Sequence, residues 1–197
     1  MQYPSFTVEL PEWASQLMPE PGRAYEHIEQ RMQLALELAR INVAHETGGP
    51  FAAAVFEQET GRLVAPGVNM VETAGCCVLH AEMVALTLAQ ARLGTFDLGA
   101  EGLPAMELVT TTEPCTMCLG AVIWSGVRRL VCGARDEDAR EIGFDEGPKP
   151  ERWPAQLETR GITVMRDICR TQGRALLMDY RDSGGLIYNP HRPGAAE

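Results

Sequence analysis

The chain has 197 residues, with 17 Lys and Arg against 27 Asp and Glu, so its formal net charge is 17 − 27 = −10. A single unit of this length buries about 70% of its unfolded-chain surface, and a hydrophobic content of 45% excludes disorder for most of it. Apart from the pair Arg128-Arg129 the basic residues are scattered, which excludes the clustered positive charge that follows a nucleic-acid backbone.

The first elements are read from proline content and apolar periodicity. Residues 1–22 contain four prolines, which predicts an irregular N-terminal arm. From 25 to 44 apolar side chains recur every three or four positions, between Ile28 and Val43, as on an amphipathic helix. Gly48-Gly49-Pro50 is expected to close this helix.

A hairpin and a second helix are expected next. Two short β-prone runs, 51–56 and 63–71, flank Glu59-Thr60-Gly61, a sequence typical of a turn. The helical period returns over 80–93, and Gly94 is expected to end it.

The rest of the chain alternates strands with helices before an acidic, loop-rich stretch and a final pair of elements. This alternation predicts an α/β sandwich with a largely buried central sheet. The expected elements are a strand (107–112), a helix (115–125), a strand (127–132), a loop (135–150), a helix (154–159), a strand (162–165), a helix (168–181) and a Gly- and Pro-rich tail (182–197).

The location of the chain is inferred from what its sequence lacks. The longest apolar run, 51–56, is far short of the ~20 residues of a membrane span, and residues 1–10 have no basic or apolar leader region. A cytoplasmic location is therefore expected. Six cysteines in such a chain favour thiols or metal ligands over disulfides; Cys132 and Cys169, in apolar surroundings, are expected to be buried.

Two motifs carry the chemistry: His80-Ala81-Glu82, and Pro114-Cys115-Thr116-Met117-Cys118, with 32 residues between Glu82 and Cys115. One imidazole and two thiolates are donors that suit Zn²⁺. If each motif opens a helix, the positive helix ends help to keep both cysteines ionised. Three protein ligands leave a fourth position for water, as at a catalytic zinc site.

Glu82 is placed to take the proton of such a water, because it lies too near His80 along the helix to be an obvious ligand. The implied reaction is hydrolytic removal of an amine from a heterocycle. The alternative is a structural zinc site with a fourth ligand from Cys76, Cys77 or another histidine, but no spacing supports one. The pair Cys76-Cys77 itself receives no functional interpretation.

These motifs, the order of elements around them, and Asn69 at eleven residues before His80 resemble the cytidine-deaminase superfamily over residues 24–134. Two branches share these features, the tRNA adenosine deaminases and the bacterial guanine deaminases. Three stretches resemble the second branch more closely: Gly49-Pro50-Phe51, Ile123-Trp124 and Gly143-Phe144-Asp145-Glu146.

The resemblance implies a three-layer α/β/α sandwich around a mixed five-stranded sheet. It also implies a zinc enzyme that converts guanine to xanthine and ammonia. His80, Cys115 and Cys118 would hold one zinc ion, with Glu82 as the principal proton shuttle and Glu146 as a second. The division expected along the chain is an arm (1–22), a zinc-dependent deaminase domain (23–181) and a tail (182–197) that closes over the site.

The resemblance further implies contacts to a free base. Asn69 would hydrogen-bond the base edge, Phe51 would pack on the ring, and the Ala81 backbone would orient the reacting group. Trp124 and Tyr188 complete the expected substrate-binding set. Each has a plainer interpretation: Phe51 as core, Asn69 as a strand-end cap, and Trp124 as core or as part of a dimer contact with Val122 and Ile123.

Three alternatives remain open. A tRNA adenosine or cytidine deaminase would share the zinc site, but the charge of −10 disfavours a polyanionic substrate. An aminotriazine or cytosine deaminase would use the same catalytic set. A zinc-stabilised module without activity would make Glu82 dispensable. The partners expected are a small nucleobase and a second copy of the chain, with no membrane and no nucleic acid.

Overall fold

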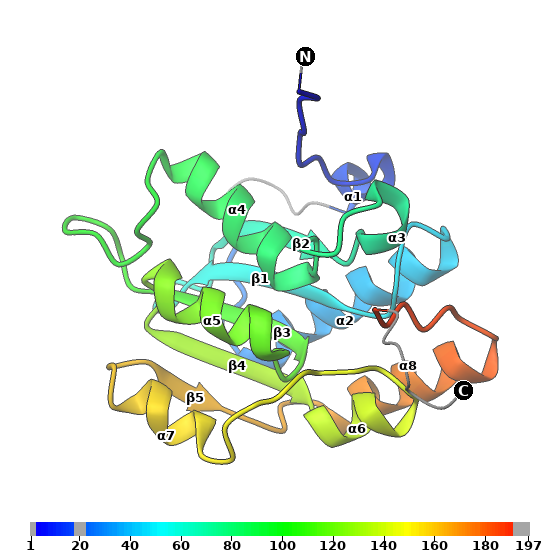
Figure 1. Ribbon diagram of the computed structural model, residues 1–197. Helices are drawn as coiled ribbons and strands as arrows, with labels where there is room; N and C mark the ends of the chain where they lie inside the picture. Colours follow the sequence, from blue (N-terminus) through cyan, green and yellow to red (C-terminus); the bar gives the residue numbers. More distant parts are fainter. Residues whose placement is uncertain (1–2, 18–22, 191–197) are drawn as a thin grey trace.

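A mixed five-stranded sheet forms the centre of the computed structural model, which describes residues 3–17 and 23–190 (Figure 1). The strand order is β2-β1-β3-β4-β5, with β1 antiparallel to both of its neighbours and β3, β4 and β5 parallel. This confirms the expected sheet and the hairpin. The strands are β1 (Ala52–Glu57), β2 (Leu63–Val68), β3 (Met106–Thr112), β4 (Arg129–Ala134) and β5 (Thr163–Met165).

Helices cover both faces of this sheet, giving the expected three layers (Figure 1). Helices α2 (Ile28–Ala44) and α8 (Arg170–Asp182) pack on one face, and α4 (Ala81–Leu93), α5 (Thr116–Ser125) and α7 (Trp153–Glu158) pack on the other. Because successive side chains of a strand point to opposite faces, Val55 belongs to the cluster under α4 and α5, whereas Phe56 belongs to the cluster under α2.

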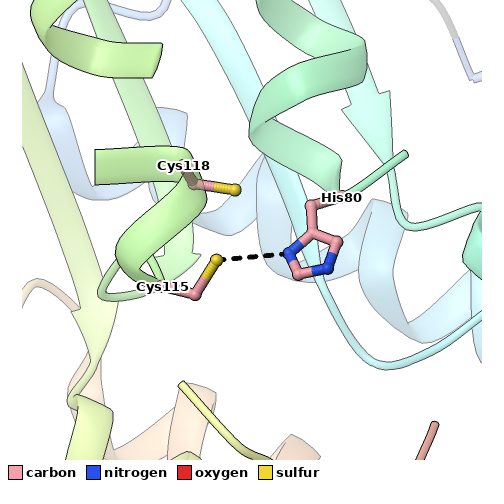
Figure 2. A group of neighbouring side chains, drawn as sticks. All are labelled: His80, Cys115 and Cys118. Atoms are coloured by element: carbon pink, nitrogen blue, oxygen red, sulfur yellow. Dashed lines mark hydrogen bonds between the residues drawn. The ribbon is translucent and has the colours of Figure 1, made fainter. Parts of the chain in front are cut away.

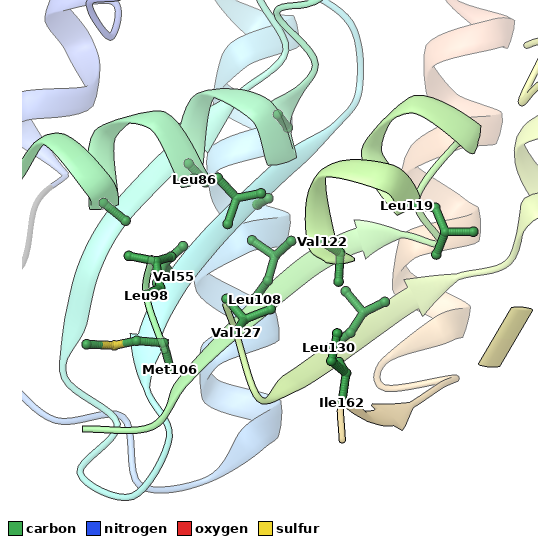
Figure 3. Packing of buried hydrophobic residues seen from close by; sticks show 14 of the residues in the cluster. Val55, Leu86, Leu98, Met106, Leu108, Leu119, Val122, Val127, Leu130 and Ile162 are labelled. Atoms are coloured by element: carbon green, nitrogen blue, oxygen red, sulfur yellow. The ribbon is translucent and has the colours of Figure 1, made fainter. Parts of the chain in front are cut away.

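The core beneath α4 and α5 is apolar across several strands. Val55, Leu108 and Leu130, from three neighbouring strands, lie under Leu86 and Val122 of the two helices (Figure 3). Cys132 is fully buried in the same cluster, as predicted. Because helices cover both faces of the sheet, every residue of β3 is buried, and so is every residue of β4 except Arg129.

Helix α4 rests directly on the backbone of β2. A Cβ atom at Gly67 would lie 2.3 Å from the carbonyl oxygen of Ala81 and 2.4 Å from the backbone nitrogen of Ala85. Neither atom can move without the helix, so the missing side chain at Gly67 allows α4 to approach the sheet this closely.

Three short helices were not predicted: α1 (Glu12–Gln16), α3 (Val71–Ala74) and α6 (Asp136–Glu141). The expectation of an irregular arm is wrong at α1, where Trp13 and Ala14 are buried against the domain. In the described part of the chain, no helix combines the length and apolar character that a membrane span requires.

Candidate functional site

The two motifs identified in the sequence meet at the starts of two helices. His80 is the N-terminal cap of α4 and Cys115 is the N-terminal cap of α5, both in extended backbone, so each motif opens a helix as predicted. Cys118 lies one turn into α5, on the side that faces His80 (Figure 2). The first backbone N–H groups of both helices are therefore directed toward one place.

One nitrogen and two sulfur donors form a compact group there. The ligand atoms of His80, Cys115 and Cys118 all lie within 4.8 Å of one another, and Cys115 Sγ is 3.4 Å from His80 Nδ1 (Figure 2). Cys118 is buried, while His80 and Cys115 are partly exposed. A set of two thiols and one imidazole fits Zn²⁺, and three donors leave one coordination position for another ligand.

The surroundings of Cys115 favour its ionised form, the thiolate. The Cys118 thiol donates to Cys115 and lowers the pKa of Cys115 to about 4, and His80 acts in the same direction against the effect of burial. For His80, burial lowers the pKa, but hydrogen bonding to Cys115 and its negative charge outweigh burial and raise it. Cys115 is thus a thiolate near neutral pH, the form that binds metal.

Glu82, two residues after His80, is a buried carboxyl beside this group. The Thr110 hydroxyl, from β3, donates a hydrogen bond of 3.3 Å to Glu82 Oε1. Burial is the main cause of a raised pKa for Glu82, and the negative charge of Cys115 adds to it. A carboxyl whose pKa is raised by burial is suited to accept and return a proton.

A second buried carboxyl, Glu146, comes from the loop after α6. The carbonyl oxygen of Glu146 accepts hydrogen bonds from the backbone nitrogen (3.0 Å) and the hydroxyl (3.2 Å) of Thr116, the residue next to Cys115. Burial, followed by the charge of Cys115, raises the pKa of Glu146 to about 8. Burial therefore favours the protonated form of the Glu146 carboxyl.

Both carboxyls line a cavity of 520 Å³. Its aromatic walls are Phe51, Phe144 and Tyr188: the ring centroids of Phe51 and Phe144 are 4.9 Å apart, and those of Phe144 and Tyr188 are 5.0 Å apart. A cavity of this size with apolar walls and a few polar groups is typical of a small-molecule site. Asn69, His80 and Cys115 also line it.

The C-terminal tail enters the cavity through Tyr188, whose hydroxyl accepts a hydrogen bond of 2.7 Å from Asn69 Nδ2. Burial raises the pKa of this phenol. The tail is fastened by Asn189, which donates to the Gly143 carbonyl and accepts from the Asp145 nitrogen, both at 2.8 Å. The segment expected to close over the site thus lies against the loop that carries Glu146.

One expected substrate contact, Trp124, differs from the sequence interpretation. Trp124 is not among the described residues that line the cavity, and it is 85% exposed. It follows Cys118 by six positions, or about 240° around the helix after full turns are subtracted, so it faces away. Ala81 is not among the described lining residues either, and its side chain is buried in the core, so the role of its backbone stays a prediction.

Two residues at the site were missed or left without a role. Phe144 was read only as part of the motif around Glu146, although its ring contacts both Phe51 and Tyr188. Cys77, exposed at the cavity lining, belongs to the unexplained cysteine pair. The spacing of Phe144, two residues before Glu146, is the signal that could have identified it.

Known proteins share these features. A family model for the zinc-binding region of cytidine and deoxycytidylate deaminases matches residues 25–134. A guanine deaminase of Bacillus subtilis (strain 168) is 36% identical over 115 residues, which cover 58% of this chain and 69% of that protein.

Two solved structures are more similar. That of a guanine deaminase from Nitrosomonas europaea is 52% identical, covers 92% of this chain and 99% of that one, and gives a TM-score of 0.87. A structure of a complex with 2,6-diaminopurine is 55% identical, covers 93% of this chain and 96% of that one, and also gives 0.87.

Proposed function

Because the chain belongs to the family of zinc-dependent cytidine and deoxycytidylate deaminases, we propose that it hydrolyses guanine to xanthine and ammonia. In this reaction the bond between C2 and the exocyclic nitrogen breaks, and the oxygen of water becomes the new oxygen on C2. The single observation that carries the proposal is the cavity itself, where two buried carboxyls and an aromatic wall adjoin the His80-Cys115-Cys118 group. Similarity to guanine deaminases over nearly the whole chain supports this substrate.

The metal site fits the zinc of the family, because its donors are one imidazole and two thiols. When bound by His80, Cys115 and Cys118, zinc activates a water molecule by lowering its pKa. Beside it, Glu82 accepts the proton at a carboxylate oxygen and passes it to a ring nitrogen of the base. Burial of Glu82 supports this role, because it raises the pKa of the carboxyl above its ordinary value.

Glu146 is the proposed second proton carrier. Burial raises the pKa of this carboxyl above its ordinary value, which favours its protonated form and lets it donate a proton to the departing amine. The hydrogen bonds between its carbonyl and Thr116 support the assignment, because they hold it close to the start of α5.

The base is expected to pack on Phe51 and to be recognised by the Asn69 carboxamide, with Tyr188 closing the cavity behind it. Both Asn69 and Tyr188 line the cavity, and the bond between them leads from the tail to the residue expected to bind the base edge. A neutral purine suits an aromatic cavity and an acidic chain better than a tRNA does.

The test is a substrate panel with zinc-loaded protein: guanine, cytosine, adenosine, an aminotriazine and tRNA under one set of conditions, with ammonia and the deaminated product measured. We expect turnover of guanine far above the others. No guanine turnover would refute the proposal, and turnover of tRNA or of another base would replace it with one of the alternatives.

Three further assignments belong to this proposal. Residues 23–181 are the catalytic domain, flanked by the arm (1–22) and the closing tail (182–197). The protein acts in the cytoplasm, in keeping with six free thiols. It forms a homodimer through α5, where Trp124 is exposed and Ile123 is half-buried; Val122 of the expected patch is fully buried and takes no part.

A further inference from the structure

The carboxamide of Asn42, near the end of α2, is fully buried and fully hydrogen-bonded. Its Nδ2 donates to the carbonyl oxygen of Gly49 at 3.0 Å and to that of Asn69 at 2.9 Å. Its Oδ1 accepts from the Thr47 hydroxyl at 2.7 Å. Both N–H groups of the amide are therefore used on backbone carbonyls that belong to two different loops.

Those two loops carry residues expected to bind the base. Gly49 lies two residues before Phe51, and the second carbonyl is that of Asn69 itself. The loops are also joined directly, because the Asn69 nitrogen donates to the Phe51 carbonyl at 3.0 Å. On the other side, a Cβ atom at Gly48 would lie 1.9 Å from the Asn69 carbonyl oxygen. The backbone of Asn69 is thus held by contacts from several directions, one of which comes from the side-chain amide of Asn42.

We propose that Asn42 is a positioning residue for substrate binding: it sets the places of Asn69 and Phe51 relative to each other and so determines affinity for the base. This inference rests on the proposed function. Asn42 is not among the described residues that line the cavity, so it acts through Asn69 and Phe51 rather than on the substrate.

The Asn42 bonds continue outward to the N-terminal arm. The Thr47 hydroxyl that donates to Asn42 also accepts from Trp13 Nε1 at 3.0 Å, and Trp13 stacks on His45. The arm lies outside residues 25–134, the range matched by the family model, yet it supports the loop that leads to Phe51. Trp13, Thr47 and Asn42 therefore form one hydrogen-bonded series from the N-terminal arm to the substrate loops.

The test compares two variants of this series. Asn42→Asp keeps the shape and the acceptor for Thr47 but removes both N–H donors. We expect KM for guanine to rise about 10- to 100-fold, the penalty typical of a binding group displaced by about 1 Å. Thr47→Val, at a half-exposed position, lets the carboxamide rotate, and KM should rise about threefold, as for a weakened neutral hydrogen bond.

A matched control separates positioning from loss of stability. Glu107 is also fully buried, and it pairs with Arg31 of the same helix α2, but it lies at the opposite end of β3 from the cavity. Glu107→Gln should lower the melting temperature with KM unchanged, because a merely structural defect reduces the folded fraction and so lowers apparent kcat alone.

A double-mutant cycle gives the second readout. If Asn42 acts through Asn69, then Asn42→Asp in an Asn69→Ala background should raise KM by less than about threefold, because coupled residues are not additive. Full additivity would overturn the inference, as would an unchanged KM in both Asn42→Asp and Thr47→Val. Should Asn42→Asp fail to fold, Thr47→Val alone decides.

Guanine turnover by the unaltered protein is measured first. Its absence would refute the proposed function and this inference together. Turnover with a normal KM in the variants would refute only the role of Asn42.

Discussion

The side-chain nitrogen of Asn69 donates its hydrogen bond to the hydroxyl of Tyr188, 119 positions later in the chain, at 2.7 Å. The residue expected to read the base is thereby connected to the segment expected to cover it. Tyr188 also packs against Phe144, so its side chain adds a polar contact and an aromatic contact to the two hydrogen bonds by which Asn189 fastens the tail.

These two contacts can be separated. Tyr188→Ala removes both, and because a buried aromatic side chain contributes about 1.5–3 kcal/mol, kcat/KM should fall about 10- to 100-fold. Tyr188→Phe keeps the ring and loses one hydrogen bond of about 1 kcal/mol, a fall of about fivefold. Steady-state kinetics with guanine measures both. Equal values for the two variants and the unaltered protein would show that the tail does not close the site.

The two buried carboxyls are predicted to differ in importance. Glu82→Ala should lower kcat by about 10⁴-fold, and Glu146→Ala by about 10²-fold, because the range for a lost proton carrier is wide and Glu82 is assigned the earlier transfer. Zinc content and melting temperature are measured alongside to show that the fold and the metal site persist. If Glu146→Ala were the more damaging variant, the two roles would have to be exchanged.

Metal removal should expose the two cysteine ligands. After dialysis against a chelator we expect the loss of deaminase activity and reaction of two additional thiols per chain with a thiol reagent. Cys115 should react faster, because its pKa of about 4 keeps it ionised. Readdition of zinc should protect both thiols and restore turnover. An unchanged thiol count would exclude Cys115 and Cys118 as ligands.

The stability of the region around α6 should depend on pH through Asp138. Burial raises the pKa of this carboxyl, but hydrogen bonds from Arg170 and from the Arg135 backbone nitrogen outweigh burial, so the pKa is lower than 3.8. A lowered pKa in the folded state stabilises the protein above the unfolded-state value of about 3.9. That contribution is lost as the pH falls through the folded-state value.

Asp138→Asn should therefore lower the free energy of unfolding by about 2 kcal/mol at pH 7, the range for a hydrogen bond to a charged group. The difference from the unaltered protein should shrink below about pH 4. Glu137→Gln is the matched control: it also removes a partner of Arg170, but from a side chain that is 65% exposed, so the effect should be small. Denaturant titrations at several pH values measure the free energy of unfolding of both variants. Equal losses of stability in Asp138→Asn and Glu137→Gln would contradict the prediction.

The proposed dimer contact can be tested by placing a charged residue in it. Trp124→Arg should convert the protein to a monomer, because it places a cation in an apolar contact. Tyr3→Arg changes an equally exposed aromatic residue, also 85% exposed, in the N-terminal arm (Figure 1), and should leave the assembly intact. Sedimentation velocity distinguishes the two outcomes. A monomeric unaltered protein would refute the dimer outright.

The sequence was informative where one local pattern determined the structure. His80 and Cys115 each precede an apolar helical period, so both helix starts, and with them the metal-ligand group, were predictable. The hairpin followed from two short β-prone runs with a turn signal between them, whereas the mixed sheet was implied only by the resemblance. The position of Glu146, by contrast, was inferred only from the resemblance, because nothing in its acidic surroundings distinguishes it.

Elements stabilised by distant partners were missed. Helix α6 is almost entirely polar, so it shows no apolar period; its Asp138 is held by Arg170, 32 positions away. Helix α1 lies among prolines and depends on the burial of Trp13. Asn42 looked like an ordinary polar position on a helix, because the carbonyls that it binds come close only in the folded chain.

The close approach of α4 to the sheet at Gly67 determines how accurately the reacting groups of the site are positioned. His80 and Glu82 stand at the first turn of α4, and the nearest fixed support beneath that turn is the backbone of β2. Any side chain at position 67 would collide with the backbone of α4. The helix would be displaced, and with it the metal ligand His80 and the carboxyl of Glu82. The accuracy with which the reacting groups meet therefore depends on a residue that has no functional group of its own.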